Sequence, residues 1–180
     1  MGFGIIAGQG TSCLEALKDG ADPDEIFATC GGGGWLSGTF LAKELLSPKS
    51  KVFAAEPLQA NDATQSYAAK KIIKFSDSPP TIADGARSPA VSERTFYYLS
   101  QLDVFFEIPE HDIIYWTQWL MHLLKITVEP TSAVAMAGAV KWLKKQKSKQ
   151  RVLVLLSVGN IAPETYQKIW QESFLEKLPI

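Results

Sequence analysis

The chain has 180 residues, of which 46% are hydrophobic and 21% charged, and its 18 Lys and Arg residues nearly balance 19 Asp and Glu residues. This is the composition of an ordinary globular protein, and roughly 150 residues make one domain with a sizeable core. Nucleic acid is not expected as the main partner, because the basic run Lys141–Lys149 is better explained as a solvated helix end. No apolar stretch reaches the roughly 18 residues of a membrane span, so no membrane association is expected.

The amino terminus and the cysteines suggest where the protein works. Met1–Gly4 has neither the positive charge nor the small-residue cleavage site of a signal peptide. Cys13 and Cys30 form neither a disulfide framework nor a metal-ligand pair, and small core residues are the simpler interpretation. We therefore expect a cytoplasmic protein in a reducing environment.

Strands and helices are predicted to alternate along the first part of the chain. The short apolar run Ile5–Ala7 predicts a strand, and Thr11 is a plausible N-cap for a helix over Ser12–Lys18 that ends at Gly20. The next predicted elements are a strand at Asp24–Cys30, a helix at Leu36–Leu46 stopped by Pro48, a strand at Val52–Ala55 and a helix at Asn61–Lys71.

A long irregular segment, Phe75–Pro89, separates these elements from the rest. It is rich in proline, and loops of this length that lack structure of their own are usually functional, so binding residues are expected there. The elements predicted after it are a helix at Ser92–Leu99, a strand at Asp103–Ile108, helices at Asp112–Leu124 and Thr131–Lys145, a strand at Val152–Leu156 and a helix at Pro163–Leu175.

This alternation predicts an α/β fold. Near-continuous apolar runs such as VLVLL are typical of strands in an open, mostly parallel sheet with helices on both faces. Ligands of such sheets bind beyond the carboxyl ends of the strands, so the residues that follow each strand are the ones to inspect.

Four successive glycines, Gly31–Gly34, stand between a predicted strand and a predicted helix. Glycine lets several N–H groups converge on one anion at the positive end of a helix, which favours a phosphate-binding loop over the alternative, a flexible hinge. The segment fits neither the Rossmann fingerprint nor a P-loop, which requires a lysine.

The sequence resembles a known family through six ordered motifs: IAGQGTSCLEAL, CGGGGWLSG, AAEPLQAND, TIADGAR, VEPTSAVAMAGA and LLSVGN. They follow one another as in the pyridoxal-phosphate enzymes of the serine/threonine dehydratase and serine racemase family, which have fold type II, like the tryptophan synthase beta subunit. The resemblance covers essentially the whole chain. It implies that residues 1–180 are the carboxyl-terminal portion of such an enzyme and form most of its large domain, with the amino-terminal part and the small domain absent.

The resemblance also implies roles for individual residues. Gly31, Gly32, Gly33 and Gly34 would hold the phosphate of pyridoxal phosphate, and Ser157 would place its hydroxyl against the pyridine nitrogen. A hydroxyl at that place suits a neutral ring nitrogen, whereas an aspartate would keep the nitrogen protonated. The family commonly has Ser-Gly-Gly-Asn here, whereas this chain has Ser157-Val158-Gly159-Asn160.

Glu56, Ala60 and Asp62 look like the metal-cation site of the dehydratase and racemase relatives. Two carboxylates and a backbone carbonyl are hard oxygen ligands suited to Mg²⁺ or Ca²⁺. On the residues alone, the alternative is that the two acidic side chains solvate a strand end and cap the next helix. Glu129 is expected to support the N-terminus of the following helix and, by resemblance, to lie near the cofactor pocket.

No residue of the chain is assigned a catalytic role. The family's cofactor-binding lysine lies in a Ser-Phe-Lys segment, and no such segment occurs in these 180 residues. His111 and His122 are better explained as surface or core-edge residues.

Three functional hypotheses follow from the missing lysine. The chain is the carboxyl-terminal part of a serine/threonine dehydratase acting on a small amino acid substrate and inactive alone, a cofactor-binding remnant without chemistry, or an assembly or regulatory module. Because a missing domain would leave a sheet edge uncovered, a homodimer or pairing with an amino-terminal portion is expected.

Overall fold

A computed structural model describes residues 1–102, 104–157, 159–176 and 178–179. Its centre is a sheet of four parallel strands in the order β3-β2-β1-β4. The strands are β1 (Glu25–Thr29), β2 (Lys51–Pro57), β3 (Phe105–Ile108) and β4 (Val152–Val154). The predicted α/β class with an open parallel sheet is confirmed.

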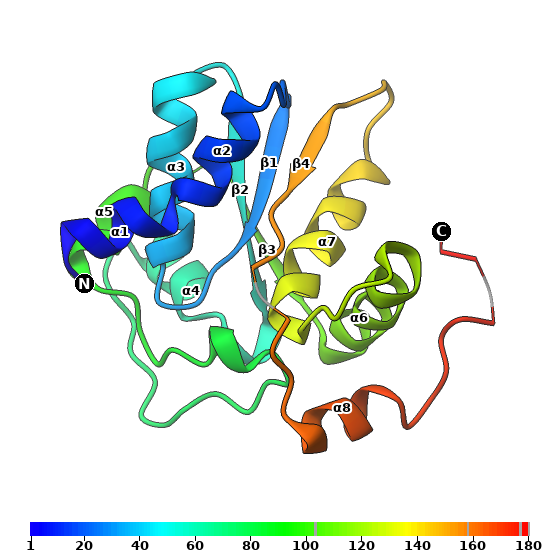
Figure 1. Ribbon diagram of the computed structural model, residues 1–180. Coiled ribbons are helices and arrows are strands. Elements are labelled where there is room, and N and C mark those ends of the chain that lie inside the picture. Colours follow the sequence, from blue (N-terminus) through cyan, green and yellow to red (C-terminus); the bar gives the residue numbers. More distant parts are fainter. Residues whose placement is uncertain (103, 158, 177, 180) are drawn as a thin grey trace.

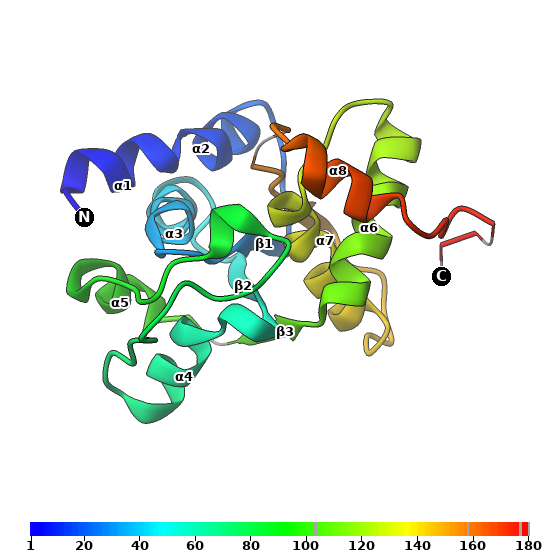
Figure 2. The same ribbon diagram turned by 90° about the horizontal axis from the view of Figure 1, so that it is seen from below.

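Helices cover both faces of this sheet (Figure 1). The elements on one face are α1 (Phe3–Gln9), α2 (Thr11–Lys18), α3 (Gly34–Leu46), α4 (Asp62–Ala69) and α5 (Glu93–Leu99). The other face is covered by α6 (Glu110–Leu124) and α7 (Pro130–Leu143), and α8 (Pro163–Ile169) packs on α6. The 3₁₀ turns η1 (Leu58–Ala60) and η2 (Asp84–Ala86) lie at the lower end of the molecule in Figure 1, which is the end that faces the reader in Figure 2.

Alternating side chains of the strands supply two cores. Ile26 and Ala28 of β1 point toward α2 and α3, whereas Phe27 points toward α7. Phe27 is fully buried, and its ring centroid lies 5.2 Å from that of Phe53 and 5.9 Å from that of Trp142. Burial of one such side chain contributes about 1.5–3 kcal/mol, so this aromatic cluster fixes α7 on the sheet.

The prediction of a strand at Ile5–Ala7 was wrong, because these residues lie in α1. Ile6 is 1% exposed and packs inward, whereas Ile5 is 55% exposed, as expected when only one face of a helix is covered. Three apolar residues are too few to show a helical period, so the sequence could not distinguish the two structures. Thr11 is also not an N-cap: it is the first residue of α2, and its hydroxyl donates to the carbonyl of Gly8 at 2.8 Å.

The remaining predicted elements are present, most with shorter bounds. The last helix ends at Ile169 rather than Leu175, and β4 ends at Val154 rather than Leu156. Asp103, where a strand was predicted to begin, lies outside the described residues. The long irregular segment Phe75–Pro89 contains only η2 as regular structure. None of the described helices is long and apolar enough to cross a membrane.

Helices α1 and α3 touch through glycine backbone. A Cβ added at Gly38 of α3 would collide with backbone atoms of Ile6 and Gly10. Backbone cannot move aside as a flexible side chain can, so only glycine permits this approach.

We expect Gly38→Ala to lower the free energy of unfolding by about 2 kcal/mol, because the added methyl group overpacks a backbone contact. Gly4→Ala in α1 is the matched control, since a Cβ there has nothing within 4 Å; it should raise stability by roughly 0.5–1 kcal/mol. Urea denaturation of both variants measures the difference, and equal effects would contradict the proposed contact.

Candidate cofactor site

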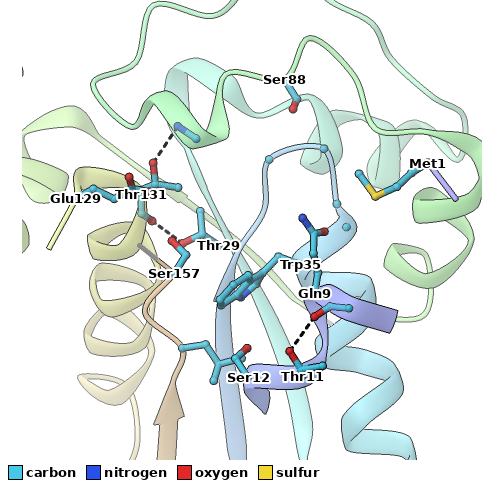
Figure 3. Close-up of a pocket in the computed structure, with 17 residues that line it drawn as sticks. Met1, Gln9, Thr11, Ser12, Thr29, Trp35, Ser88, Glu129, Thr131 and Ser157 are labelled. Atoms are coloured by element: carbon cyan, nitrogen blue, oxygen red, sulfur yellow. Dashed lines mark hydrogen bonds between the residues drawn. The ribbon is translucent and has the colours of Figure 1, made fainter. Parts of the chain in front are cut away.

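A cavity with a volume of about 560 Å³ lies beyond the carboxyl ends of β1 and β4 (Figure 3). This is the edge at which ligands of parallel α/β sheets bind, and the volume falls in the range of small-molecule sites. The lining residues include Gly31–Gly34 and Ser157, together with Gln9, Thr29, Gly85, Ser88, Glu129 and Thr131. The fold thus brings the glycines and Ser157, far apart in sequence, to one cavity.

The glycine loop, Gly31–Gly34, connects β1 to α3. Among the described residues, none accepts a hydrogen bond from the backbone N–H of Gly31, Gly32 or Gly33. Gly34 begins α3, whose first N–H groups have no acceptor within the helix. These donors at the positive end of a 13-residue helix provide the geometry of an anion site.

Only glycine fits at two positions of this loop. Gly33 has φ +80°, and a Cβ there would lie 2.9 Å from side-chain atoms of Thr95 and Leu99. A Cβ at Gly31 would lie 2.7 Å from the carbonyl oxygen of Gly85. The loop is therefore a close-packed turn rather than a hinge with room to move.

Gln9 and Met1 approach the loop from α1 and the residues before it. Both side chains point into the cavity, and both occupy the space where a Cβ of Gly34 would stand (Figure 3). Sequence reasoning missed Gln9, although it precedes Gly10, whose backbone packs closely on Gly38 of α3.

Ser157 lies on the opposite wall, three residues after β4. Its backbone N–H donates to Oγ of Ser132 at 2.9 Å, and the two hydroxyl oxygens lie 3.0 Å apart. Val158, the residue that departs from the family pattern, lies outside the described residues.

Threonines complete the wall between the glycine loop and Ser157. Thr29, at the end of β1, donates through its hydroxyl to the carbonyl of Thr131 at 2.7 Å. Thr131 accepts a hydrogen bond from the N–H of Gly85 at 3.0 Å, which fastens η2 of the long irregular segment to α7. Gly85 and Ser88 line the cavity, in agreement with the expectation that this segment contributes binding residues.

Glu129 lies in the cavity wall, but it does not cap α7 with its side chain. It is the N-cap by position, yet its carboxylate makes no capping hydrogen bond; its backbone carbonyl instead accepts from Ser132 N–H at 3.0 Å. Pro130, the first helical residue, has no N–H to donate. Burial, and then the charge of Asp84, raise the pKa of Glu129, and the nearby Thr131 hydroxyl lowers it by less.

Glu56 and Asp62 lie together in the protein interior and are not among the residues that line this cavity. Glu56, at the end of β2, accepts hydrogen bonds from the backbone N–H groups of Ala63 and Thr64 and from the Thr64 hydroxyl. Burial raises its pKa to about 8, against the opposing effect of these Thr64 bonds. Glu56 therefore binds the first turn of α4, as the helix-capping alternative predicted.

Unlike Glu56, the Asp62 side chain accepts no hydrogen bond from a described residue. It is fully buried, and neither carboxylate oxygen has a hydrogen-bond partner among the described residues. Burial raises its pKa to about 6; the backbone N–H groups of Val91 and of Asp62 itself, too poorly placed for hydrogen bonds, offset part of that rise. No group of three or more His, Cys, Asp and Glu side chains in the described structure could hold a metal ion, so a cation site would also need the carbonyl of Ala60.

The fold and the cavity define an α/β protein with a glycine-lined cavity at the carboxyl edge of its parallel sheet. Residues 3–158 match the family described as pyridoxal-phosphate dependent enzyme, and the chain belongs to this family. The resemblance found in the sequence is thereby confirmed.

Two curated proteins with different activities are similar in sequence to this chain. The chain is 37% identical over 164 residues to an L-threo-3-hydroxyaspartate ammonia-lyase of Saccharomyces cerevisiae, covering 90% of this chain and 49% of the relative. It is also 37% identical over 168 residues to a serine racemase of Dictyostelium discoideum, covering 92% and 52%. The chain spans about half the length of the curated relatives it matches.

Solved structures give the same result for the fold. A threonine deaminase of T.th. matches with a TM-score of 0.80 and 36% identity, covering 87% of this chain and 58% of that structure. Maize serine racemase matches with a TM-score of 0.82 and 32% identity, covering 92% and 52%. The parallel sheet and its helices are thus the fold of these enzymes.

We expect Gly33→Ala, alone and combined with Gly32→Ala, to weaken the binding of inorganic phosphate on the order of tenfold, because alanine is strained at positive φ. Gly32→Ala alone is milder, since the nearest atom to its Cβ would be the Ser88 hydroxyl oxygen, at 3.2 Å. Calorimetric titration with phosphate measures the change, with Gly4→Ala as the control and circular dichroism to verify folding. Unchanged affinity in a folded double variant would refute phosphate binding at this loop.

Proposed function

We propose that this chain provides the cofactor-binding part of a pyridoxal-phosphate-dependent ammonia-lyase that acts on a hydroxy amino acid. One observation carries the proposal: a loop of four glycines, whose N–H groups have no acceptor among the described residues, faces a serine hydroxyl across one cavity of about 560 Å³. Such a cavity fits a flat ring that bears a phosphate at one end and an acceptor nitrogen at the other.

Each wall of the cavity has a distinct task in this proposal. The N–H groups of Gly31–Gly34 bind the phosphate dianion, assisted by the positive end of α3. Ser157 donates a hydrogen bond to the neutral ring nitrogen, and Glu129 and Thr131 line the space between. When bound, pyridoxal phosphate supplies an electron sink for negative charge at the substrate α-carbon.

The substrate class follows from what the relatives' names share. Hydroxyaspartate, serine and threonine are small amino acids with a hydroxyl on the β-carbon, and the activities named for them are ammonia loss and racemisation. We propose ammonia loss from one of these amino acids as the reaction of the enzyme to which this chain contributes.

The residues that line the described cavity include no lysine. The family's chemistry requires a lysine that joins the cofactor covalently and moves the α-proton. This observation favours the proposal that the 180 residues alone bind the cofactor without turnover, and it equally supports the second candidate function, a non-catalytic cofactor-binding protein.

We expect the isolated chain to release no ketoacid from L-serine, L-threonine or L-threo-3-hydroxyaspartate in the presence of pyridoxal phosphate, because no lysine reaches the cofactor. A coupled ketoacid assay measures this, with the yeast ammonia-lyase as the positive control. Sustained turnover that is lost on replacing a lysine of this chain would show the proposal to be wrong.

Another polypeptide chain is proposed to cover the open side of the molecule. β4 is an edge strand with half-buried apolar side chains, and Leu123, Leu124 and Ile126 are exposed near the end of α6. Such surfaces are commonly closed by a partner. We propose a second copy of the chain, or a segment equivalent to the part of the relatives that this chain does not match.

Glu56, Asp62 and the carbonyl of Ala60 are proposed to hold Mg²⁺ or Ca²⁺. Both carboxylate oxygens of Asp62 are buried next to the Glu56 carboxylate and have no hydrogen-bond partner among the described residues. Burying such a charge costs free energy unless a cation neutralises it, which supports a cation site at these residues. The bound cation would supply positive charge that stabilises the connection from β2 through η1 to α4.

We expect Mg²⁺ or Ca²⁺ at about a hundred times its dissociation constant to stabilise the protein by about 2.7 kcal/mol, and Asp62→Asn to abolish that gain. Thermal unfolding with and without the cation measures it, with the exposed Asp77→Asn as the control. Asp62→Asn should not lower stability in the absence of the cation, because it removes a buried charge. A cation effect that survives in Asp62→Asn would place the site elsewhere.

A further inference from the structure

The hydroxyl oxygen of Ser132 lies within hydrogen-bond distance of two atoms of Ser157, its backbone nitrogen and its hydroxyl oxygen. Ser132 is the third residue of α7 and is fully buried. Its Oγ accepts the backbone N–H of Ser157 at 2.9 Å and lies 3.0 Å from the Ser157 Oγ. Neither bond is between near neighbours in sequence, so each connects the start of α7 to the segment after β4.

Ser157 needs such support because regular structure ends before it. Among the described residues after β4, the last backbone hydrogen bond to the sheet runs from Leu155 N–H to the carbonyl of Phe27, at 2.9 Å. Ser157 lies two residues beyond Leu155. A serine outside regular structure has three staggered positions for its hydroxyl. The Ser132 hydroxyl favours the one that keeps the two oxygens within hydrogen-bond distance.

Either hydroxyl can be the donor in the contact between Ser132 Oγ and Ser157 Oγ. The bond from the Ser157 backbone N–H to Ser132 Oγ has a fixed direction, and it holds Ser157 in place whichever hydroxyl donates. An acceptor nitrogen of a ligand in the cavity would select the arrangement in which the Ser157 hydroxyl donates to that nitrogen. The positive end of α7 lies beside both hydroxyls and disfavours a positive charge on the ligand atom, so a neutral acceptor nitrogen is the better partner.

We propose that Ser132 is a positioning residue that fixes the Ser157 hydroxyl as a donor to the ring nitrogen of the cofactor. This inference rests on the proposed function. Ser132 does not touch the ligand in this proposal, and it acts only through Ser157.

A double-mutant cycle tests the proposal, with wild type, Ser132→Ala, Ser157→Ala and the double variant. The probe is pyridoxine 5′-phosphate, which has the ring and the phosphate but no aldehyde to react with surface lysines. Calorimetry measures its affinity, and the ¹⁵N resonance of a labelled ring nitrogen reports the hydrogen bond. Inorganic phosphate is titrated in parallel to probe the glycine loop alone.

Each single variant is expected to bind pyridoxine 5′-phosphate about fivefold more weakly, which is the size of one hydrogen bond. The double variant should bind no more weakly than Ser157→Ala, because Ser132 acts through Ser157. The ¹⁵N resonance should move in the same direction in both single variants, while phosphate affinity stays unchanged. Ser50→Ala, which loses a buried hydrogen bond to Pro23 at the amino end of β2, should leave both readouts unchanged.

Other outcomes would overturn the inference in distinguishable ways. Additive losses, or an unchanged ¹⁵N resonance in Ser132→Ala, would mean that Ser132 does not act through Ser157, while the proposed function would stand. A wild-type chain that binds neither phosphate nor pyridoxine 5′-phosphate would overturn the proposed function and this inference with it. Ser132→Cys, which fills the same space with a weak hydrogen-bonding group, provides the same test if Ser132→Ala does not fold.

Discussion

The turn from β1 into α3 is the constraint on which the rest of the site depends. Four residues reverse the chain at the carboxyl edge of the sheet, and at Gly33 the backbone has a positive φ. η2 packs against this turn at Gly31, and α5 packs against it at Gly33. Any side chain at Gly31 or Gly33 would strike these neighbours. The close packing that excludes side chains is also what leaves backbone N–H groups as the inner surface of the cavity.

The same packing organises elements far from the loop. α1 lies close against α3, which the backbone contact of Gly38 with Gly10 permits. α1 in turn brings Gln9 to the cavity, and α7 brings Thr131. Helices on opposite faces of the sheet thus deliver their N-termini or side chains to one edge, as expected for parallel α/β proteins.

The sequence predicted the fold and the two walls of the cavity, but not the polar groups that connect them. Gly31–Gly34 was visible because four successive glycines between a strand and a helix form a local pattern typical of anion-binding loops, and Ser157 was found through the family resemblance. Thr29, Thr131 and Ser132 were missed because a threonine or serine near an element end is ordinarily a cap or a turn residue. Their role depends on hydrogen bonds across more than 20 positions of sequence, such as Thr29 to Thr131, which no local pattern encodes.

The polar groups and helix ends around the cavity are suited to binding a cofactor. Around the glycine loop and Ser157, the protein offers neutral donors and the positive ends of α3 and α7, which are suited to a phosphate and an acceptor nitrogen. The buried carboxylates of Glu56 and Asp62 are not among the residues that line that cavity. The residues that line the described cavity include no lysine to react with a carbonyl group. Under the proposed function, the residues that line this cavity recognise the cofactor, whereas activation of a substrate would need a lysine that none of them supplies.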